Sequence, residues 1–152
     1  MVTVATRDFG QLELDEARIV EFPEGLPGFE GSQRFVLIQP NADTPLSVLQ
    51  SVEQPDVAFV VTNPFFFYQE YEFQLSDKMV QELEVQSEQD VSVWVIVRLT
   101  EDLAEATMNL LAPIVVNEPK RLAKQMILHR SEYNTKHKLL SAEPAEAVAE
   151  RE

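Results

Sequence analysis

Few residues in this 152-residue chain have the type and spacing that catalysis or metal binding requires. The two histidines, His129 and His137, lie eight positions apart, which matches no helical spacing of metal ligands, and we interpret each as an ordinary surface residue. Cysteine is absent, which excludes thiol catalysis, disulfide bonds and thiolate metal sites. No serine occupies a G-x-S-x-G turn, so a hydrolase nucleophile of that type is also excluded.

One pair of carboxylates, Glu70 and Glu72, has an i, i+2 spacing that could serve acid and base chemistry. The chain contains 26 acidic residues, however, so such pairs arise without any catalytic role. We therefore predict no catalytic, cofactor-binding or metal-binding residues and expect that the protein is not an enzyme. A carboxylate enzyme is the alternative, and it would need a cleft in which burial or a neighbouring charge strongly raises a carboxyl pKa.

The glycine-rich segment FPEGLPGFEG, residues 22–31, is tested as a phosphate-binding loop. Such a loop needs successive free backbone N–H groups and usually a lysine followed by a helix N-terminus. Pro27 lacks the donor, Glu24 and Glu30 flank it, and no lysine follows. We interpret the segment as a shaped surface loop whose Leu26 and Phe29 point inward.

The stretch from Val57 to Leu75 has the highest density of apolar and aromatic residues in the chain, and the rest is organised around it. Val57 to Val61 is a continuous apolar run that predicts a strand buried on both faces. After Asn63-Pro64, apolar residues recur at alternate positions and predict a second strand. The side chains expected to face inward are Phe65, Phe67, Tyr71, Phe73 and Leu75.

The opposite face of this second strand carries Phe66, Tyr68, Glu70 and Glu72. An exposed aromatic patch with carboxylates at its rim is typical of a surface that recognises another protein. The hypothesis is that these four residues, with Asn63 at the preceding corner, bind a protein partner. The alternative is that another segment of the same chain covers Phe66 and Tyr68.

The remaining patterns predict a single domain over residues 1–140 that is built mostly of β-strands, with one or two short helices. Ser76 is the expected N-cap of a helix to about Val85. Residues 120–128 fit a helix or a strand, and we predict a turn followed by a strand. Residues 141–152 form an acidic tail that we expect to be disordered. The other predicted strands are Val2 to Thr6, Gln11 to Leu14, Ala17 to Phe22, Arg34 to Gln39, Leu46 to Val52, Val91 to Leu99, Ala106 to Leu111 and Ile114 to Val116.

The net charge of −14 is concentrated in residues 1–77, which hold 13 acidic residues against three arginines. Such a surface repels phosphate backbones, so we expect no direct nucleic-acid binding. Basic residues gather after residue 119, where we expect them to complement the acidic half. No apolar run approaches the roughly 18 residues that cross a bilayer, and no signal peptide is apparent, so we expect a cytoplasmic protein without membrane contact.

Several separate motifs occur in an order that resembles one known family, the flagellar assembly factor FliW. They cover residues 2 to about 140 and leave only the acidic tail outside the pattern. The motifs are the opening TRDFG, the loop FPEGLPGFE, the corner Asn63-Pro64-Phe65, and the run NLLAPIVVN at 109–117 followed by Gln125 and Tyr133.

The resemblance implies a small, mostly antiparallel all-β domain, barrel-like, over residues 1–140 of a cytoplasmic protein. It also implies two protein partners. One is flagellin, and the other is the RNA-binding translational repressor CsrA, which the family antagonises away from its RNA-binding surface. When flagellin is exported, the freed factor would bind CsrA and flagellin translation would resume. We expect the free protein to be a monomer. The alternative is a structural or scaffolding subunit of an oligomeric assembly, which would expose a large apolar patch.

Overall fold

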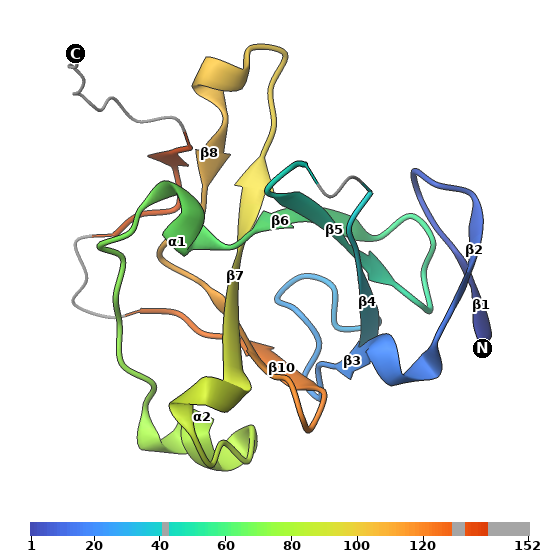
Figure 1. Ribbon diagram of the computed structural model, residues 1–152, viewed down its shortest axis with the longest axis horizontal. Coiled ribbons are helices and arrows are strands. Elements are labelled where there is room, and N and C mark those ends of the chain that lie inside the picture. The colour runs from blue at the N-terminus through green and yellow to red at the C-terminus, as the bar shows by residue number, and fades with distance from the viewer. Residues whose placement is uncertain (41–42, 129–132, 140–152) are drawn as a thin grey trace.

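The computed structural model describes residues 1–40, 43–128 and 133–139, in which β-strands predominate (Figure 1). The described residues contain two short α-helices, α1 (Pro64–Phe67) and α2 (Asp77–Glu82). The mostly antiparallel all-β fold with short helices, predicted from the sequence, is confirmed. The strands are β1 (Val2–Ala5), β2 (Gln11–Leu14), β3 (Ile19–Glu21), β4 (Arg34–Ile38), β5 (Leu46–Ser51), β6 (Ala58–Thr62), β7 (Val91–Arg98), β8 (Thr107–Met108), β9 (Ile114–Asn117), β10 (Leu122–Gln125) and β11 (His137–Lys138).

Seven of these strands close into a barrel with the order β7, β6, β5, β4, β3, β10, β9. The ring closes because β7 pairs with both β6 and β9, so that Trp94 lies opposite Ile114 and Ile96 lies opposite Val61. All of these pairings are antiparallel except β3 with β10, which is parallel and brings Glu21 beside Leu122. The barrel therefore joins segments that are about a hundred residues apart in the sequence.

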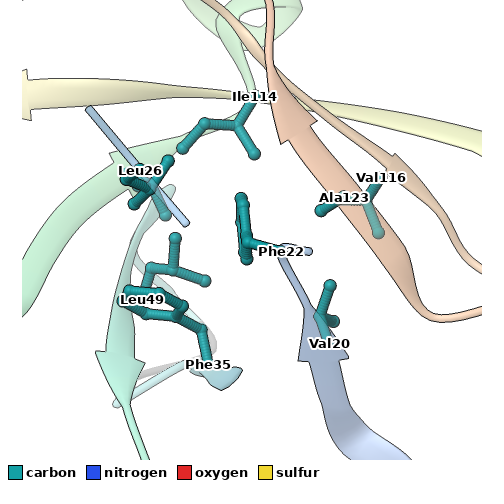
Figure 2. Close-up of a cluster of buried hydrophobic side chains, with 9 residues drawn as sticks. Val20, Phe22, Leu26, Phe35, Leu49, Ile114, Val116 and Ala123 are labelled. Atoms are coloured by element: carbon teal, nitrogen blue, oxygen red, sulfur yellow. The ribbon is translucent and has the colours of Figure 1, made fainter. Parts of the chain in front are cut away.

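The interior of the barrel is a cluster of buried aliphatic and aromatic side chains (Figure 2). Phe22 and Phe35 pack edge to face with ring centroids 5.1 Å apart. Leu26 enters this cluster from the loop between β3 and β4 and is only 2% exposed. The loop thus contributes to the barrel core, and the prediction that Leu26 points inward is confirmed. The labelled cluster in Figure 2 is Val20, Phe22, Leu26, Phe35, Leu49, Ile114, Val116 and Ala123.

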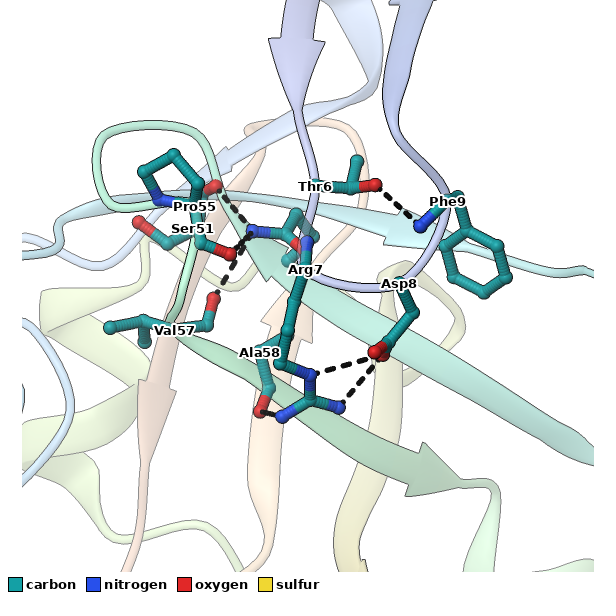
Figure 3. A network of polar contacts seen from close by, with 9 residues as sticks. Thr6, Arg7, Asp8, Phe9, Ser51, Pro55, Val57 and Ala58 are labelled. Carbon is teal, nitrogen blue, oxygen red and sulfur yellow. Dashed lines mark hydrogen bonds and ion pairs between the residues drawn. The ribbon is translucent and has the colours of Figure 1, made fainter.

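The β1–β2 hairpin packs on the outside of the barrel, where Val4 contacts the outward side chains of β4 and β5. Arg7 anchors the end of the hairpin through its backbone N–H, which donates to Gln50 Oε1 at 3.0 Å, and through Nη1, which donates to the Ala58 carbonyl at 2.8 Å (Figure 3). Gln50 is fully buried, and its amide Nε2 donates to carbonyls at the β5–β6 turn. These bonds satisfy a buried polar side chain that would otherwise be costly.

Two further clusters cover the outside of the barrel around β7 and β9. Tyr71, Val95 and Leu110 belong to the first, which also includes residues of β8 and α1. The second places Met79 and Leu83, at α2, against Val115 of β9. Ser76 caps α2, because its hydroxyl oxygen accepts the Met79 N–H at 3.1 Å, as the sequence predicted.

Some boundaries differ from the predicted ones. The predicted strand from Ala17 begins only at Ile19, because Asp15 caps a single 3-10 turn over Glu16–Arg18. The predicted strand from Ala106 to Leu111 is reduced to β8, since Asn109 turns the chain by accepting two backbone N–H groups with Oδ1. Phe29 was expected to point inward but is 41% exposed and packs edge to face on Phe59 at 5.1 Å. The predicted strand within 120–128 is confirmed as β10.

The basic C-terminal part contacts the acidic N-terminal half at one ion pair among the described residues. Lys124 Nζ lies 3.3 Å from Glu24 and 2.7 Å from Glu82. The hydrogen bond with Glu82 raises the pKa of Lys124 and lowers the pKa of that carboxyl. Arg121 also reaches the N-terminal half, because its Nη2 donates to the Arg18 carbonyl at 2.7 Å. The predicted disorder of residues 141–152 lies outside the described residues.

Candidate functional site: an aromatic ledge at helix α1

The predicted partner-binding residues lie where β6 ends and the chain turns into α1. Asn63 caps this helix, because its side-chain Oδ1 accepts the Phe65 N–H at 2.9 Å. Pro64 occupies the first helical position, where its missing N–H costs no intrahelical bond. Tyr68 N–H then donates to the Pro64 carbonyl at 2.9 Å and ends the single turn. The sequence folds this way because a capping residue followed by proline favours a helix start over a continued strand.

The prediction of one strand from Phe65 to Leu75 is therefore wrong. Phe65, expected to be in the core, is 37% exposed, and Phe67 is half-buried. From Tyr71 onward the predicted alternation does hold, since Tyr71 is buried, Phe73 is half-buried and Glu72 between them is exposed. This extended segment nevertheless pairs with no strand in the described part of the chain.

Phe66, Phe67, Tyr68, Gln69, Glu70 and His137 line a shallow depression of about 580 Å³, which we call the aromatic ledge. Phe66 is 66% exposed, and its ring packs edge to face on Phe67 at 5.1 Å. Glu70 is exposed beside it. A large apolar ring held in water next to a carboxylate has no evident purpose in folding, so it suits contact with another molecule.

Buried and half-buried aromatic side chains hold the ledge in place from below. Tyr68 stacks on His137 with ring centroids 5.1 Å apart and an angle of 30° between the planes. Tyr71 packs against Tyr133 at 4.7 Å, and its hydroxyl donates to the Leu110 carbonyl at 2.7 Å. Tyr133 in turn accepts the Glu72 N–H with its hydroxyl at 3.1 Å. The ledge is thus a rigid surface rather than a free loop.

The electrostatic character of the ledge is negative. None of the described residues that line it is lysine or arginine. Burial lowers the pKa of His137 below its usual value, so the imidazole is uncharged at neutral pH. Glu70 therefore faces the depression without a cationic side chain among the lining residues, and a lysine or arginine of a partner would find both a carboxylate and an aromatic ring there.

The FliW protein family model matches residues 3–139. The chain belongs to the FliW family of flagellar assembly factors. It is 44% identical over 136 residues to the flagellar assembly factor FliW of Geobacillus sp. (strain WCH70), covering 90% of this chain and 94% of that protein. The corresponding Bacillus subtilis (strain 168) protein is 40% identical over 134 residues, covering 88% and 94%. A crystal structure of the flagellar assembly factor FliW superposes with a TM-score of 0.87 at 41% identity, covering 93% of this chain and 99% of that chain.

In this member of the FliW family, the structure places the predicted site residues at three different positions. Phe66, Tyr68 and Glu70 meet at the ledge. Glu72 instead lines a neighbouring groove on the other side of the extended segment. Asn63 is exposed, but its side-chain oxygen serves as the helix cap.

Sequence reasoning missed two supporting residues of the ledge. Tyr133 was noted only as part of a motif, and His137 was interpreted as an ordinary surface residue, whereas it is half-buried and stacked on Tyr68. Both lie more than 60 positions after the ledge, and neither belongs to a periodic pattern, so only the fold brings them together. His129 lies outside the described residues.

The described residues offer no alternative site for metal chemistry. No group of three or more histidine or acidic side chains among them is arranged to hold a metal ion. Within the same part of the chain, no helix is long and apolar enough to span a membrane.

Proposed function

We propose that this flagellar assembly factor acts in the cytoplasm by binding two proteins, flagellin and the translational repressor CsrA. When flagellin accumulates, it occupies the factor. When flagellin is exported, the freed factor binds CsrA away from its RNA-binding surface and relieves repression, so that flagellin synthesis follows export. Membership in the family supports this role, and so does the aromatic ledge with its exposed Phe66.

The observation that carries the proposal is the aromatic ledge with its exposed Phe66 and acidic rim. An RNA-binding repressor is basic, and the net charge of −14 on this chain attracts it over a distance of about one Debye length, or roughly 8 Å at physiological salt. Phe66 then supplies an apolar anchor of the kind that forms the centre of protein interfaces. Charge sets the association rate, and the aromatic contact sets the lifetime of the complex.

The test is a kinetic binding measurement between the purified protein and CsrA by surface plasmon resonance at low and at threefold higher salt. The variant Glu70→Lys should reduce the association rate several-fold at low salt and flatten its salt dependence. The variant Phe66→Ala should mainly raise the dissociation rate. The matched control is Glu13→Lys, which makes the same change in net charge at an exposed position on the β1–β2 hairpin.

If both charge variants slow association equally, the effect is one of net charge and the ledge is not the CsrA surface. The same protein should bind purified flagellin, and light scattering should show a free monomer of 17.3 kDa. A stable homo-oligomer that binds neither protein would favour the scaffolding alternative instead.

A further inference from the structure

The strand β7 is paired unevenly along its two edges. On one edge it pairs with β9 from Val91 to Trp94 and then with β8. On the other edge β6 pairs with it only at Val95 and Ile96. The ladder stops there because β6 ends at Thr62 and the chain turns at Asn63-Pro64 into α1. No strand in the described part of the chain pairs with residues 91–94 on that edge.

The direction of the backbone groups shows which atoms this open edge presents. Asn109 N–H donates to the Ile96 carbonyl at 2.9 Å, and Glu118 N–H donates to the Asp90 carbonyl at 2.8 Å, so the even-numbered residues point toward β8 and β9. Alternate residues of a strand point their N–H and C=O groups to opposite edges. The groups of Val91 and Val93 therefore point to the open edge. The Val91 N–H is already used, because it donates to Glu88 within the turn before β7.

A groove of about 610 Å³ lies beside this open edge. Its floor includes Val91 and Val93, and the extended segment 71–75, which descends from α1 to α2 in Figure 1, forms one wall. Val80 and Val85 close the end near α2. The apolar side chains of this wall that line the groove are Tyr71, Phe73 and Leu75, and Phe65 of α1 lines it as well.

The charges of the groove restrict what can occupy it. Its charged lining residues are Glu72 and Glu88, both exposed, and none of the described lining residues is basic. A second copy of this acidic chain would bring carboxylates against carboxylates, so charge opposes pairing of β7 with itself. A segment with lysine or arginine between apolar residues would place its apolar side chains against the groove walls and its positive charges near Glu72 and Glu88.

We propose that this groove binds an extended segment of a partner protein, which adds as a strand to the open edge of β7. The segment alternates apolar residues, which fill the groove, with lysine or arginine residues, which reach Glu72 and Glu88. Four edge residues span about 13 Å at the usual rise of a strand, which is enough for one short peptide strand. Strand addition of this kind derives affinity from main-chain hydrogen bonds and specificity from alternate side chains. The proposal does not depend on the identity of the partners named above.

The first test uses a synthetic peptide of alternating lysine and valine and amide hydrogen exchange of the full-length protein measured by NMR. Bound peptide should slow exchange of the Val93 amide by about tenfold or more, because that N–H gains an acceptor. The amides of Ser92 and Trp94 already face β9 and serve as internal controls, with little change expected. Slowed Val93 exchange in the protein alone, rising with its concentration, would instead show self-pairing and overturn the proposal.

The second test separates strand pairing from simple charge attraction. Two isomeric peptides are prepared, one N-methylated at every valine and the other at every lysine. Both have the same side chains and charge, but each lacks the backbone N–H donors along one edge. Fluorescence anisotropy should show one isomer binding like the parent and the other about tenfold or more weaker. Equal binding of both isomers would refute the added strand.

A charge variant of the protein tests whether the peptide binds in the groove. Glu88→Lys should weaken binding of the unmodified peptide several-fold, whereas Glu13→Lys, with the same change in net charge on the β1–β2 hairpin, should weaken it less. Neither variant alters the aromatic ledge. Equal loss in both variants would place the peptide elsewhere on the acidic surface.

Discussion

At the scale of single residues, Tyr71 has the central role in supporting the aromatic ledge. It is 2% exposed, and its hydroxyl donates to the buried carbonyl of Leu110. Burial is the main cause that raises the pKa of Tyr71 well above the usual range, and the neighbouring Tyr133 raises it further. The hydroxyl therefore keeps its proton and remains a donor at any physiological pH. Tyr71 thus ties the segment after α1 to the chain between β8 and β9.

The substitution Tyr71→Phe tests this role, because it removes only the hydroxyl. The Leu110 carbonyl would then lose a donor in a buried place, which should lower the free energy of unfolding by about 1–3 kcal/mol. Urea denaturation followed by circular dichroism measures the change. Thr100→Val is the matched control, since it removes an exposed hydroxyl that donates to the Asp102 carbonyl. Its cost should be about 0.5 kcal/mol or less, and an equal cost for both would contradict the role of Tyr71.

The individual ledge residues could be predicted from the sequence only in part. The composition around Phe66 and Glu70 indicated an exposed aromatic patch with a carboxylate rim, and both are exposed. Tyr68 is instead half-buried, because His137 and Tyr133 cover its ring from segments far along the chain. The alternation of apolar and polar residues along one segment cannot indicate partners that lie so far away in the sequence.

At the scale of elements, α1 shows how two local signals can compete. The alternating residues from Phe65 onward favoured a strand, whereas Asn63-Pro64 is a helix start. The helix start prevails over the first turn, and the alternation survives only from Tyr71 to Leu75. By contrast, β5 and β7 were predicted to within a residue or two. An alternating pattern between two turn segments indicated β5, and a run rich in valine indicated β7.

The loop from Phe22 to Gly31 offers a test at the same scale through two of its glycines. Gly25 has a φ of +68° and Gly28 a φ of +85°, so alanine is strained at either position by about 1–2 kcal/mol. A Cβ on Gly25 would also lie 2.8 Å from the Glu30 Cα, whereas a Cβ on Gly28 would meet no atom within 4 Å.

Gly25→Ala should therefore lower the free energy of unfolding more than Gly28→Ala does, by a further 1–3 kcal/mol or so. Chemical denaturation of the two variants side by side gives this difference. The two variants control for each other, because both introduce the same methyl group at a positive φ. Equal destabilisation would mean that the turn moves freely away from Glu30 and does not hold the loop shape.

At the scale of the whole molecule, closure of the barrel is the feature that local patterns did not reveal. The strands could be found one by one, but the parallel contact of Glu21 with Leu122 and the pairing of β7 with β9 depend on long-range packing. The resemblance of separate motifs to the FliW family supplied the barrel-like fold where periodicity could not. The open edge of β7 also depends on how the barrel is closed. Because β6 pairs with β7 only at Val95 and Ile96, residues 91–94 have no partner strand on that edge among the described residues.

The barrel also depends on a residue that belongs to none of its strands. Leu26 enters the interior from the loop after β3 and packs among Phe22, Leu49 and Ile114 (Figure 2). Leu26→Ala should leave a cavity next to the small space of about 50 Å³ already lined by Phe22, Leu49 and Ile114. We expect the free energy of unfolding to fall by about 2–5 kcal/mol, as for other buried leucines.

Phe29→Ala, in the same loop, is the control for this prediction. It deletes more atoms than Leu26→Ala but from a side chain that is 41% exposed, so it should cost less. Guanidinium denaturation gives both free energies of unfolding. A larger loss for Phe29→Ala would show that the loop stabilises the fold through its contact with Phe59 and not by filling the barrel.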